Sequence, residues 1–134
     1  MNPQAAELPR PGSILLVEDS RDVRLGMQQL LELYGYLVDS TSDAEQALAR
    51  LAASPRQFAL VLLDLRLPGA LSGYDVRARQ LADPTLAGVP TVVITALEPP
   101  PDEREALHSD GWLDKPFRSE ALLNMVRKFV VPGE

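Results

Sequence analysis

The segment FALVLLD, residues 58–64, is an unbroken apolar run that ends in an aspartate. A continuous apolar run of this length is typical of a strand that is buried on both faces of a parallel sheet. The segment ILLV, residues 14–17, has the same character and is followed directly by two acids. These segments predict two strands of a parallel sheet, each with acidic residues at its carboxyl end.

Three shorter apolar runs predict further strands at residues 36–38, 90–94 and 112–113. Between the strands, apolar residues recur at helical spacing and predict helices with one buried face. The residues expected on these faces are Val23, Met27, Leu30, Leu31, Ala44, Ala47, Leu48, Leu51, Val76, Leu81, Leu122, Leu123, Val126 and Phe129. A further short helix is expected over residues 102–107. Alternating strands and helices predict an α/β fold with a parallel sheet between two layers of helices.

Local signals predict where helices begin and end. Gly35 is expected to stop the first helix. Ser42, with Glu45 three residues later, predicts a capping box at the second, and Ser119 is a candidate N-cap of the last. Residues 1–12 contain three prolines and are expected to form a flexible tail or linker, and residues 131–134 a frayed end. Residues 13–130 then form one domain.

Composition excludes several classes of protein. The 134 residues include no cysteine, which excludes disulfides and thiolate chemistry, and the single His108 argues against a histidine metal site or a serine–histidine triad. Thirteen basic against nineteen acidic residues give a net charge of −6, which disfavours direct nucleic-acid binding. No apolar run approaches the roughly 20 residues that cross a membrane, and no signal peptide opens the chain. A cytoplasmic protein without membrane insertion is therefore expected.

Polar residues stand where the predicted strands end, at the edge where ligands bind in such sheets. Glu18 and Asp19 follow the first strand, Asp64 the third, Thr95 ends the fourth, and Lys115 follows the fifth. In a sheet of order 2-1-3-4-5 the first and third strands are neighbours, so the three acids converge. Two charges ~4 Å apart repel by ~4 kcal/mol at an effective dielectric near 20. Three such groups are expected either to raise the pKa of one of them or to bind a cation, for which Mg²⁺ suits these ligands. Such a site suits a phosphoryl group, with Asp64 as the nucleophile.

The segments ILLVEDSRD, LLDLRLPG, TVVITA and WLDKPF resemble the receiver domain of two-component response regulators, of the kind found in chemotaxis regulators. The resemblance covers residues 13–130. It implies a flavodoxin-like three-layer sandwich with a five-stranded parallel sheet of order 2-1-3-4-5 and five helices. It also implies a phosphorylation-controlled switch. Such a protein is not an enzyme with an external product, although it promotes its own phosphoryl transfer and dephosphorylation.

The resemblance also implies a role for each site residue, with Asp64 as the phosphoacceptor. The groups that would hold Mg²⁺, or Mn²⁺ in its place, are Glu18, Asp19, Asp64 and the backbone carbonyl of Arg66. Lys115 would pair with Asp64 and then with the phosphoryl oxygens. Thr95 would move its hydroxyl onto the phosphoryl group while Trp112, at an aromatic switch position, fills the vacated space. The Lys115–Pro116 bond is expected to be cis.

The implied partners are a histidine kinase or a histidine phosphotransfer protein and a downstream protein that the sequence does not name. The chain is expected to be a monomer or a phosphorylation-dependent dimer. Two features depart from the family pattern: the loop between Asp64 and Gly73 is one residue longer, and His108 or Ser109 stands where glycine is frequent. The triple proline at residues 99–101 is expected to shorten the following helix.

Blander interpretations exist for individual residues. Asp19 alone could cap a helix, Lys115 could be a surface charge, and Trp112 could be simple packing. A haloacid-dehalogenase-type phosphatase is disfavoured because it needs a second aspartate two residues after Asp64, where Arg66 stands. The main alternative is an unphosphorylated receiver-like scaffold for protein–protein binding.

Overall fold

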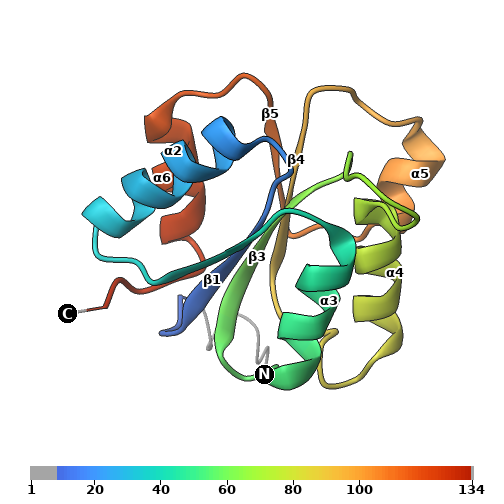
Figure 1. Ribbon diagram of the computed structural model, residues 1–134, viewed down its shortest axis with the longest axis horizontal. Helices are drawn as coiled ribbons and strands as arrows, with labels where there is room; N and C mark the ends of the chain where they lie inside the picture. The colour runs from blue at the N-terminus through green and yellow to red at the C-terminus, as the bar shows by residue number, and fades with distance from the viewer. Residues whose placement is uncertain (1–8, 134) are drawn as a thin grey trace.

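The computed structural model describes residues 9–133 and contains one sheet of five parallel strands in the order β2-β1-β3-β4-β5. This architecture confirms the predicted fold (Figure 1). The strands are β1 (Ser13–Val17), β2 (Val38–Thr41), β3 (Phe58–Asp64), β4 (Thr91–Thr95) and β5 (Gly111–Asp114). The helices are α2 (Arg21–Leu33), α3 (Ala44–Ala53), α4 (Gly73–Ala82), α5 (Pro101–Ala106) and α6 (Ser119–Arg127).

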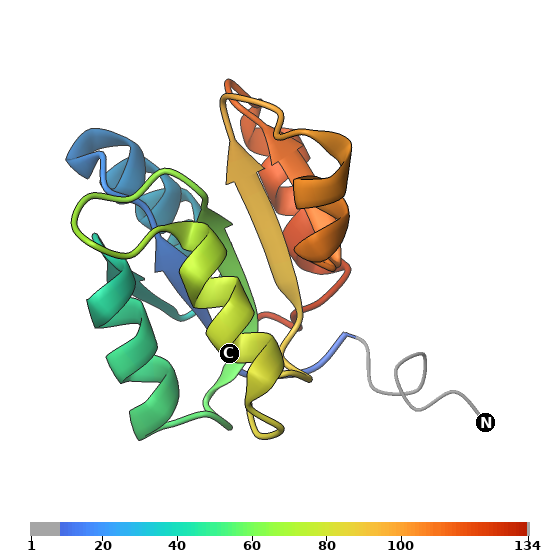
Figure 2. The same cartoon turned by 90° about the vertical axis from the view of Figure 1, so that its right-hand side faces the viewer.

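Helices cover both faces of the sheet, with α2 and α6 on one side and α3, α4 and α5 on the other (Figures 1 and 2). Successive residues of a strand point to opposite faces. Accordingly, Ile14 packs in the cluster that contains Met27 and Leu31 of α2, whereas Leu15 packs in the cluster that contains Leu51 of α3. Because both faces are buried, the central strands need the continuous apolar runs that are seen in the sequence.

The register of the strands places their carboxyl ends level with one another. Val17 of β1 pairs with Leu63 of β3, so that Glu18 emerges beside Asp64. Asp64 in turn pairs with Ile94 of β4, one residue before Thr95. Thr95 pairs with Asp114 of β5, one residue before Lys115. The register alone therefore brings four of the predicted site residues to one edge.

The second strand was predicted at residues 36–38, which is wrong by about two residues. Tyr36 is buried in the cluster that contains α2 residues, while Leu37 is 66% exposed and precedes the strand. Pairing with β1 begins at Val38 and continues through the polar segment VDST. This edge strand tolerates polar side chains because it has a neighbour on one side only, so the apolar run did not mark it.

Three predictions about the helices also need correction. The N-cap of α3 is Asp43, whose side chain accepts a hydrogen bond from the Gln46 amide at 2.8 Å, and Ser42 does not form the expected box. Ser119 is the first residue of α6 rather than its cap. Val23 is 39% exposed and lies outside the core, which α2 enters through Met27 and Leu31. Gly35 ends the α2 segment with a φ of +92°, as predicted.

Helix α4 buries polar residues that its sequence pattern did not indicate. Leu81 was expected in the core, but the buried side chains beyond Val76 are Arg77 and Gln80. The Arg77 guanidinium donates to the carbonyl oxygens of Leu107 and His108 at 2.7 and 2.6 Å and to the Thr91 hydroxyl at 3.0 Å. A buried charge persists where hydrogen bonds satisfy it. This network attaches α4 to the end of α5, where His108 adopts a φ of +45°.

Both ends of the described chain are hydrogen-bonded to the domain. Arg10 and Val130 form an isolated parallel bridge, and the Gly133 amide donates to the Gly35 carbonyl at 2.8 Å. These contacts differ from the loose ends that the prolines suggested, while residues 1–8 and 134 of those predicted segments lie outside the described residues. Within residues 9–133, none of the helices has the length and apolar character that crossing a membrane requires.

Candidate functional site

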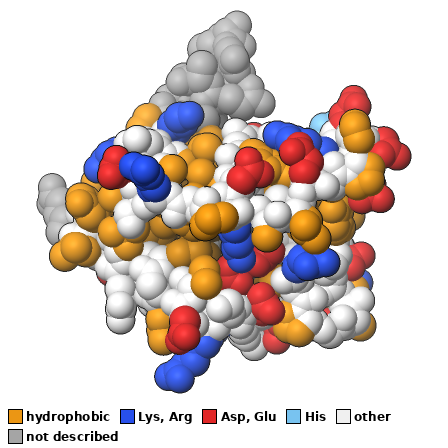
Figure 3. Space-filling view, turned by 90° about the horizontal axis from the view of Figure 1, so that it is seen from above, with side chains coloured by type: hydrophobic (Ala, Val, Ile, Leu, Met, Phe, Trp, Pro, Cys, Tyr) orange, Lys and Arg blue, Asp and Glu red, His pale blue; other side chains and the backbone are white. Residues whose placement is uncertain are grey.

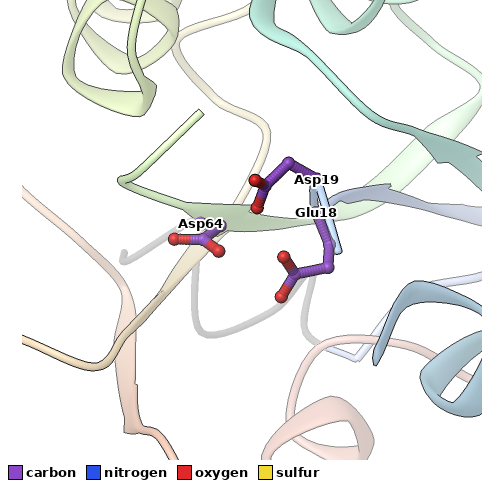
Figure 4. A group of neighbouring side chains, drawn as sticks. All are labelled: Glu18, Asp19 and Asp64. Carbon is purple, nitrogen blue, oxygen red and sulfur yellow. The ribbon is translucent and has the colours of Figure 1, made fainter. Parts of the chain in front are cut away.

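Three carboxylates meet at the carboxyl edge of the sheet. One oxygen from each of Glu18, Asp19 and Asp64 can be chosen so that all three lie within 4.8 Å of one another, and the side chains point into a shared space (Figure 4). Glu18 and Asp64 are 1% and 4% exposed, whereas Asp19 is exposed. The predicted convergence of these groups is therefore observed, and their roles remain predictions.

Lys115 places its ammonium between the two buried carboxylates. Its Nζ lies 2.5 Å from Glu18 Oε1 and 2.8 Å from Asp64 Oδ2. Figure 3 looks down on this end of the molecule, where basic and acidic side chains lie side by side near the middle of the face. One positive charge against three negative charges leaves the cluster acidic. These contacts exclude the interpretation of Lys115 as a surface charge without a structural role. The remaining negative charge of the cluster favours the binding of a second cation.

Backbone amides orient the two buried carboxylates. The Arg66 amide donates to Asp64 Oδ1 at 2.9 Å, and the Ser20 amide donates to Glu18 Oε2 at 3.1 Å. In the described chain the Asp19 carboxylate has no hydrogen-bond donor, so Asp19 is the most available ligand for a cation. Ser20 is the N-cap residue of α2, which rejects the interpretation of Asp19 as the cap.

The pKa values reflect burial and mutual charge. Burial raises the pKa of Glu18 and the negative charge of Asp64 adds to the effect, while the hydrogen bond from Lys115 opposes both without overcoming them. For Lys115 burial alone would lower the pKa, but the hydrogen bonds from its ammonium to Asp64 and Glu18 outweigh it, so the pKa is raised. The site therefore favours the charged form of Lys115 and disfavours the ionised form of Glu18.

Glu18→Gln is expected to stabilise the metal-free protein at neutral pH, by the 0.5–2 kcal/mol that is typical of single stabilising substitutions, about 1 kcal/mol in order of magnitude. Because the pKa of Glu18 is raised in the folded state, folding favours its neutral form, which glutamine mimics. The advantage should shrink as the pH falls through the raised Glu18 pKa, since the wild type then becomes neutral too. Chemical denaturation in the presence of a chelator, at a series of pH values, measures it. A glutamine variant less stable than the wild type at neutral pH would contradict this reading.

A cavity of about 460 Å³ opens beside the acidic cluster. Its lining consists of Asp19, Asp64, Arg66, Leu67, Pro68, Ala96 and Lys115. Carboxylate oxygens are the ligands that a hard divalent cation such as Mg²⁺ prefers, and such an ion usually keeps several waters. The donor set and the adjoining space therefore fit a hydrated Mg²⁺ ion. No described contact tests the Arg66 carbonyl as a further ligand.

Thr95 and Trp112 lie beyond the carboxylates. Thr95 is 2% exposed, and its hydroxyl donates to the Leu97 carbonyl at 2.9 Å, so it is engaged with the backbone that follows β4. Trp112 is half-buried against the cluster of Leu65, Val93 and Leu107, and its indole N–H donates to Asp114 Oδ1 at 3.1 Å. The predicted cis bond between Lys115 and Pro116 is present.

Two arginines that the sequence interpretation missed contact residues of the candidate site, Arg24 at Glu18 and Asp19 and Arg104 at Trp112. The Arg24 guanidinium donates to the backbone carbonyls of Glu18 and Asp19. The Arg104 guanidinium lies 4.1 Å from the centroid of the Trp112 ring and forms an ion pair with Glu98. The only signal for Arg24 was its place on the first turns of a helix that follows two acids, and nothing local indicated Arg104.

Comparison with known proteins gives one consistent result. Residues 14–127 match the family model of the response regulator receiver domain. The chain is 38% identical over 121 residues to the C4-dicarboxylate transport transcriptional regulatory protein DctD of Rhizobium meliloti (strain 1021), covering 87% of this chain and 25% of that protein. It is also 38% identical over 119 residues to the response regulator MprA of Mycolicibacterium vanbaalenii, covering 87% of this chain and 49% of that protein. The chain thus spans a quarter to a half of the length of these relatives.

Solved structures agree with the sequence relatives. The chemotaxis response regulator CheY4 of Vibrio cholerae superposes with a TM-score of 0.77 at 27% identity, covering 87% of this chain and 97% of that chain. The Mn²⁺-bound form of response regulator Rcp1 superposes with a TM-score of 0.71 at 32% identity, covering 87% of this chain and 90% of that chain.

Proposed function

Because the chain belongs to the response regulator receiver domain family, we propose that it accepts a phosphoryl group on Asp64 from a phosphohistidine and changes conformation in response. The observation that carries this proposal is the environment of Asp64. Its carboxylate contacts the Lys115 ammonium and lies close to the carboxylates of Glu18 and Asp19, beside an open cavity. A nucleophile that faces both a fixed cation and a cation site is what phosphoryl transfer requires.

The residues that would hold Mg²⁺ are Glu18, Asp19, Asp64 and the carbonyl of Arg66. When bound, the ion neutralises negative charge on the phosphoryl oxygens. The Mn²⁺-bound form of Rcp1, a structural relative, supports a divalent cation in this family. Lys115 lies 2.8 Å from Asp64, so its ammonium can stay with Asp64 and also donate to a phosphoryl oxygen that arrives there.

In the proposed transfer, one Asp64 oxygen forms a bond to phosphorus as the phosphorus–nitrogen bond of the donor breaks. The electron pair of that bond returns to the imidazole, which takes up a proton. Reversal of the signal is the attack of water on the same phosphorus, which releases inorganic phosphate and regenerates the carboxylate. Arg66, exposed at the cavity two residues past Asp64, is proposed to influence the rate of this hydrolysis.

The conformational response is proposed to begin at Thr95. Its hydroxyl would leave the Leu97 carbonyl and donate to a phosphoryl oxygen, which frees the segment after β4. Trp112 would then leave the Arg104 guanidinium and the Asp114 carboxylate and fill the vacated space. The charge and the acceptor oxygens that a phosphoryl group brings supply the free energy for such a change.

The test is incubation with Mg²⁺ and the small phosphodonor acetyl phosphate. Intact mass should rise by one phosphoryl group, and a chelator should prevent the gain. Trp112, the single tryptophan, should change its fluorescence in the same samples. A flat fluorescence signal in fully phosphorylated protein would reject the coupling to Trp112 but not the phosphorylation.

The second candidate function, an unphosphorylated scaffold, is favoured if the mass stays unchanged with both acetyl phosphate and a cognate kinase. The proposed donor is a histidine kinase or a histidine phosphotransfer protein, because the chain belongs to the response regulator receiver domain family. A cytoplasmic location and a monomer, or a dimer that forms on phosphorylation, remain part of this proposal. Residues 13–130 are the proposed receiver domain.

A further inference from the structure

The connection between β1 and α2 carries two of the three clustered carboxylates. Glu18 is held by its contacts with Lys115 and the Ser20 amide. Asp19 is exposed, and its carboxylate has no hydrogen-bond donor among residues 9–133, so side-chain contacts do not orient it. The direction of the Asp19 side chain must therefore depend on how its backbone is held.

Arg24 holds that backbone. Its Nη1 donates to the Glu18 carbonyl at 2.9 Å and to the Asp19 carbonyl at 3.2 Å. Its own amide donates to the Ser20 carbonyl at 2.8 Å, which ties Arg24 to the first turn of α2. One guanidinium nitrogen of a residue in α2 thus donates hydrogen bonds to two successive backbone carbonyls. The planar guanidinium on a regular helix makes a well-defined anchor.

The Arg24 guanidinium contacts the backbone of Glu18 and Asp19 but does not neutralise their carboxylates. Within the described chain it forms no ion pair with Glu18, Asp19 or Asp64, and the ion pairs of Glu18 and Asp64 are made with Lys115 instead. Arg24 contacts the carbonyl oxygens of Glu18 and Asp19, whereas the carboxylates of these residues point into the space that they share with Asp64. Groups that orient metal ligands without touching the metal change metal affinity about 10- to 100-fold when they are removed.

We propose that Arg24 is a positioning residue that orients Glu18 and Asp19 for a divalent cation through their backbone carbonyls. The inference rests on the proposed function for the nature of the ion. For the removal of Arg24, the positioning role and simple electrostatics predict opposite changes in cation affinity. Removing a positive charge near an acidic site should tighten cation binding, whereas removing a positioning residue should weaken it.

The experiment compares Arg24→Met with Arg21→Met. Arg21 is an exposed residue of the same helix that makes no side-chain hydrogen bond or ion pair in the described structure, so its replacement removes the same charge alone. Mn²⁺ is titrated into each protein and free Mn²⁺ is followed by electron paramagnetic resonance, with Mg²⁺ added as competitor. Arg24→Met should bind about 10-fold more weakly than the wild type. Arg21→Met should bind as the wild type does or more tightly, and Arg24→Lys should recover part of the loss.

An Arg24→Met protein that is folded and binds Mn²⁺ as tightly as the wild type overturns the inference. If that variant does not fold, Arg24→Lys decides instead: unchanged affinity overturns the inference, and weaker affinity supports it. With acetyl phosphate, the Arg24 variants should need more Mg²⁺ for half-maximal phosphorylation but reach a wild-type maximal rate. The Mn²⁺ titration uses no phosphodonor, so it tests this inference separately from the proposed function. A chain that binds Mn²⁺ but never gains a phosphoryl group would contradict the proposed function without contradicting the role of Arg24.

Discussion

Asp64→Asn is expected to abolish phosphorylation by acetyl phosphate, with an intact mass that stays unchanged while the wild type gains one phosphoryl group. Asparagine keeps the shape of the side chain at the end of β3, where Asp64 is 4% exposed. Its amide offers no nucleophilic carboxylate oxygen, and its NH₂ group cannot accept the hydrogen bond that Lys115 now donates to Asp64 Oδ2. Loss of the nucleophile removes the bond-forming step, so no partial activity is expected.

The matched control is Asp102→Asn, which makes the same chemical change at an exposed residue of α5. It should be phosphorylated as the wild type is. A phosphoryl group on the Asp64→Asn protein would show that another residue accepts it, and the assignment of Asp64 would then be wrong. Peptide mapping after borohydride reduction of the acyl phosphate would locate the modified residue.

Lys115→Met is expected to lower both stability and reactivity. It leaves the buried carboxylates of Glu18 and Asp64 facing each other without a counter-charge. Breaking a buried ion pair costs 3–5 kcal/mol, and because the Lys115 side chain keeps 23% exposure we expect about 3 kcal/mol. Mg²⁺ should restore part of the loss, since an ion that binds only the folded state stabilises it. The phosphorylation rate should fall about 100-fold even at saturating Mg²⁺, as when one charge-stabilising donor is removed.

The stability difference between Lys115→Met and the wild type should depend on pH in a defined direction. Because the pKa of Lys115 is raised above its ordinary value of 10.5, its contribution is fully present below pH 10.5 and is lost as the pH rises through the raised value. Denaturant unfolding of both proteins across the alkaline range measures the difference. Lys128→Met, which removes the other lysine at an exposed position, should show neither effect. A constant difference through the alkaline range would refute the proposed electrostatic role.

The alternation of strands and helices could be predicted because it depends on neighbouring residues. The continuous runs at residues 14–17 and 58–63 indicated strands that are buried on both faces, and the structure buries them. The same rule failed at β2, where only one side of the strand pairs and polar residues suffice. The Ser42 cap was misplaced by one residue because Asp43 is an equally suitable N-cap.

The membership of the candidate site could also be predicted, because parallel strands end at one edge and the acids, Thr95 and Lys115 stand where strands end. The resemblance also implied the pairing of Lys115 with Asp64, which the structure shows, but the other contacts of these side chains could not be predicted. Nothing in the sequence indicated that Lys115 would contact Glu18, 97 residues away, or that the Thr95 hydroxyl would be engaged with Leu97. The burial of Arg77 could not be predicted either, since a charged residue on a short helix normally faces water.

Periodicity, glycine and proline signals and the order of polar groups after apolar runs are properties of short stretches, and they were enough to predict the layers and the edge that carries the candidate site. The strand order followed from the resemblance to receiver domains. Which donor meets which acceptor depends instead on the register between strands and on side-chain conformations that the whole packed core selects. Arg24 reaching back to two carbonyls and Arg104 lying over Trp112 are contacts of that second kind. These contacts form only when the helices pack on the sheet, because that packing brings each guanidinium within reach of its partner.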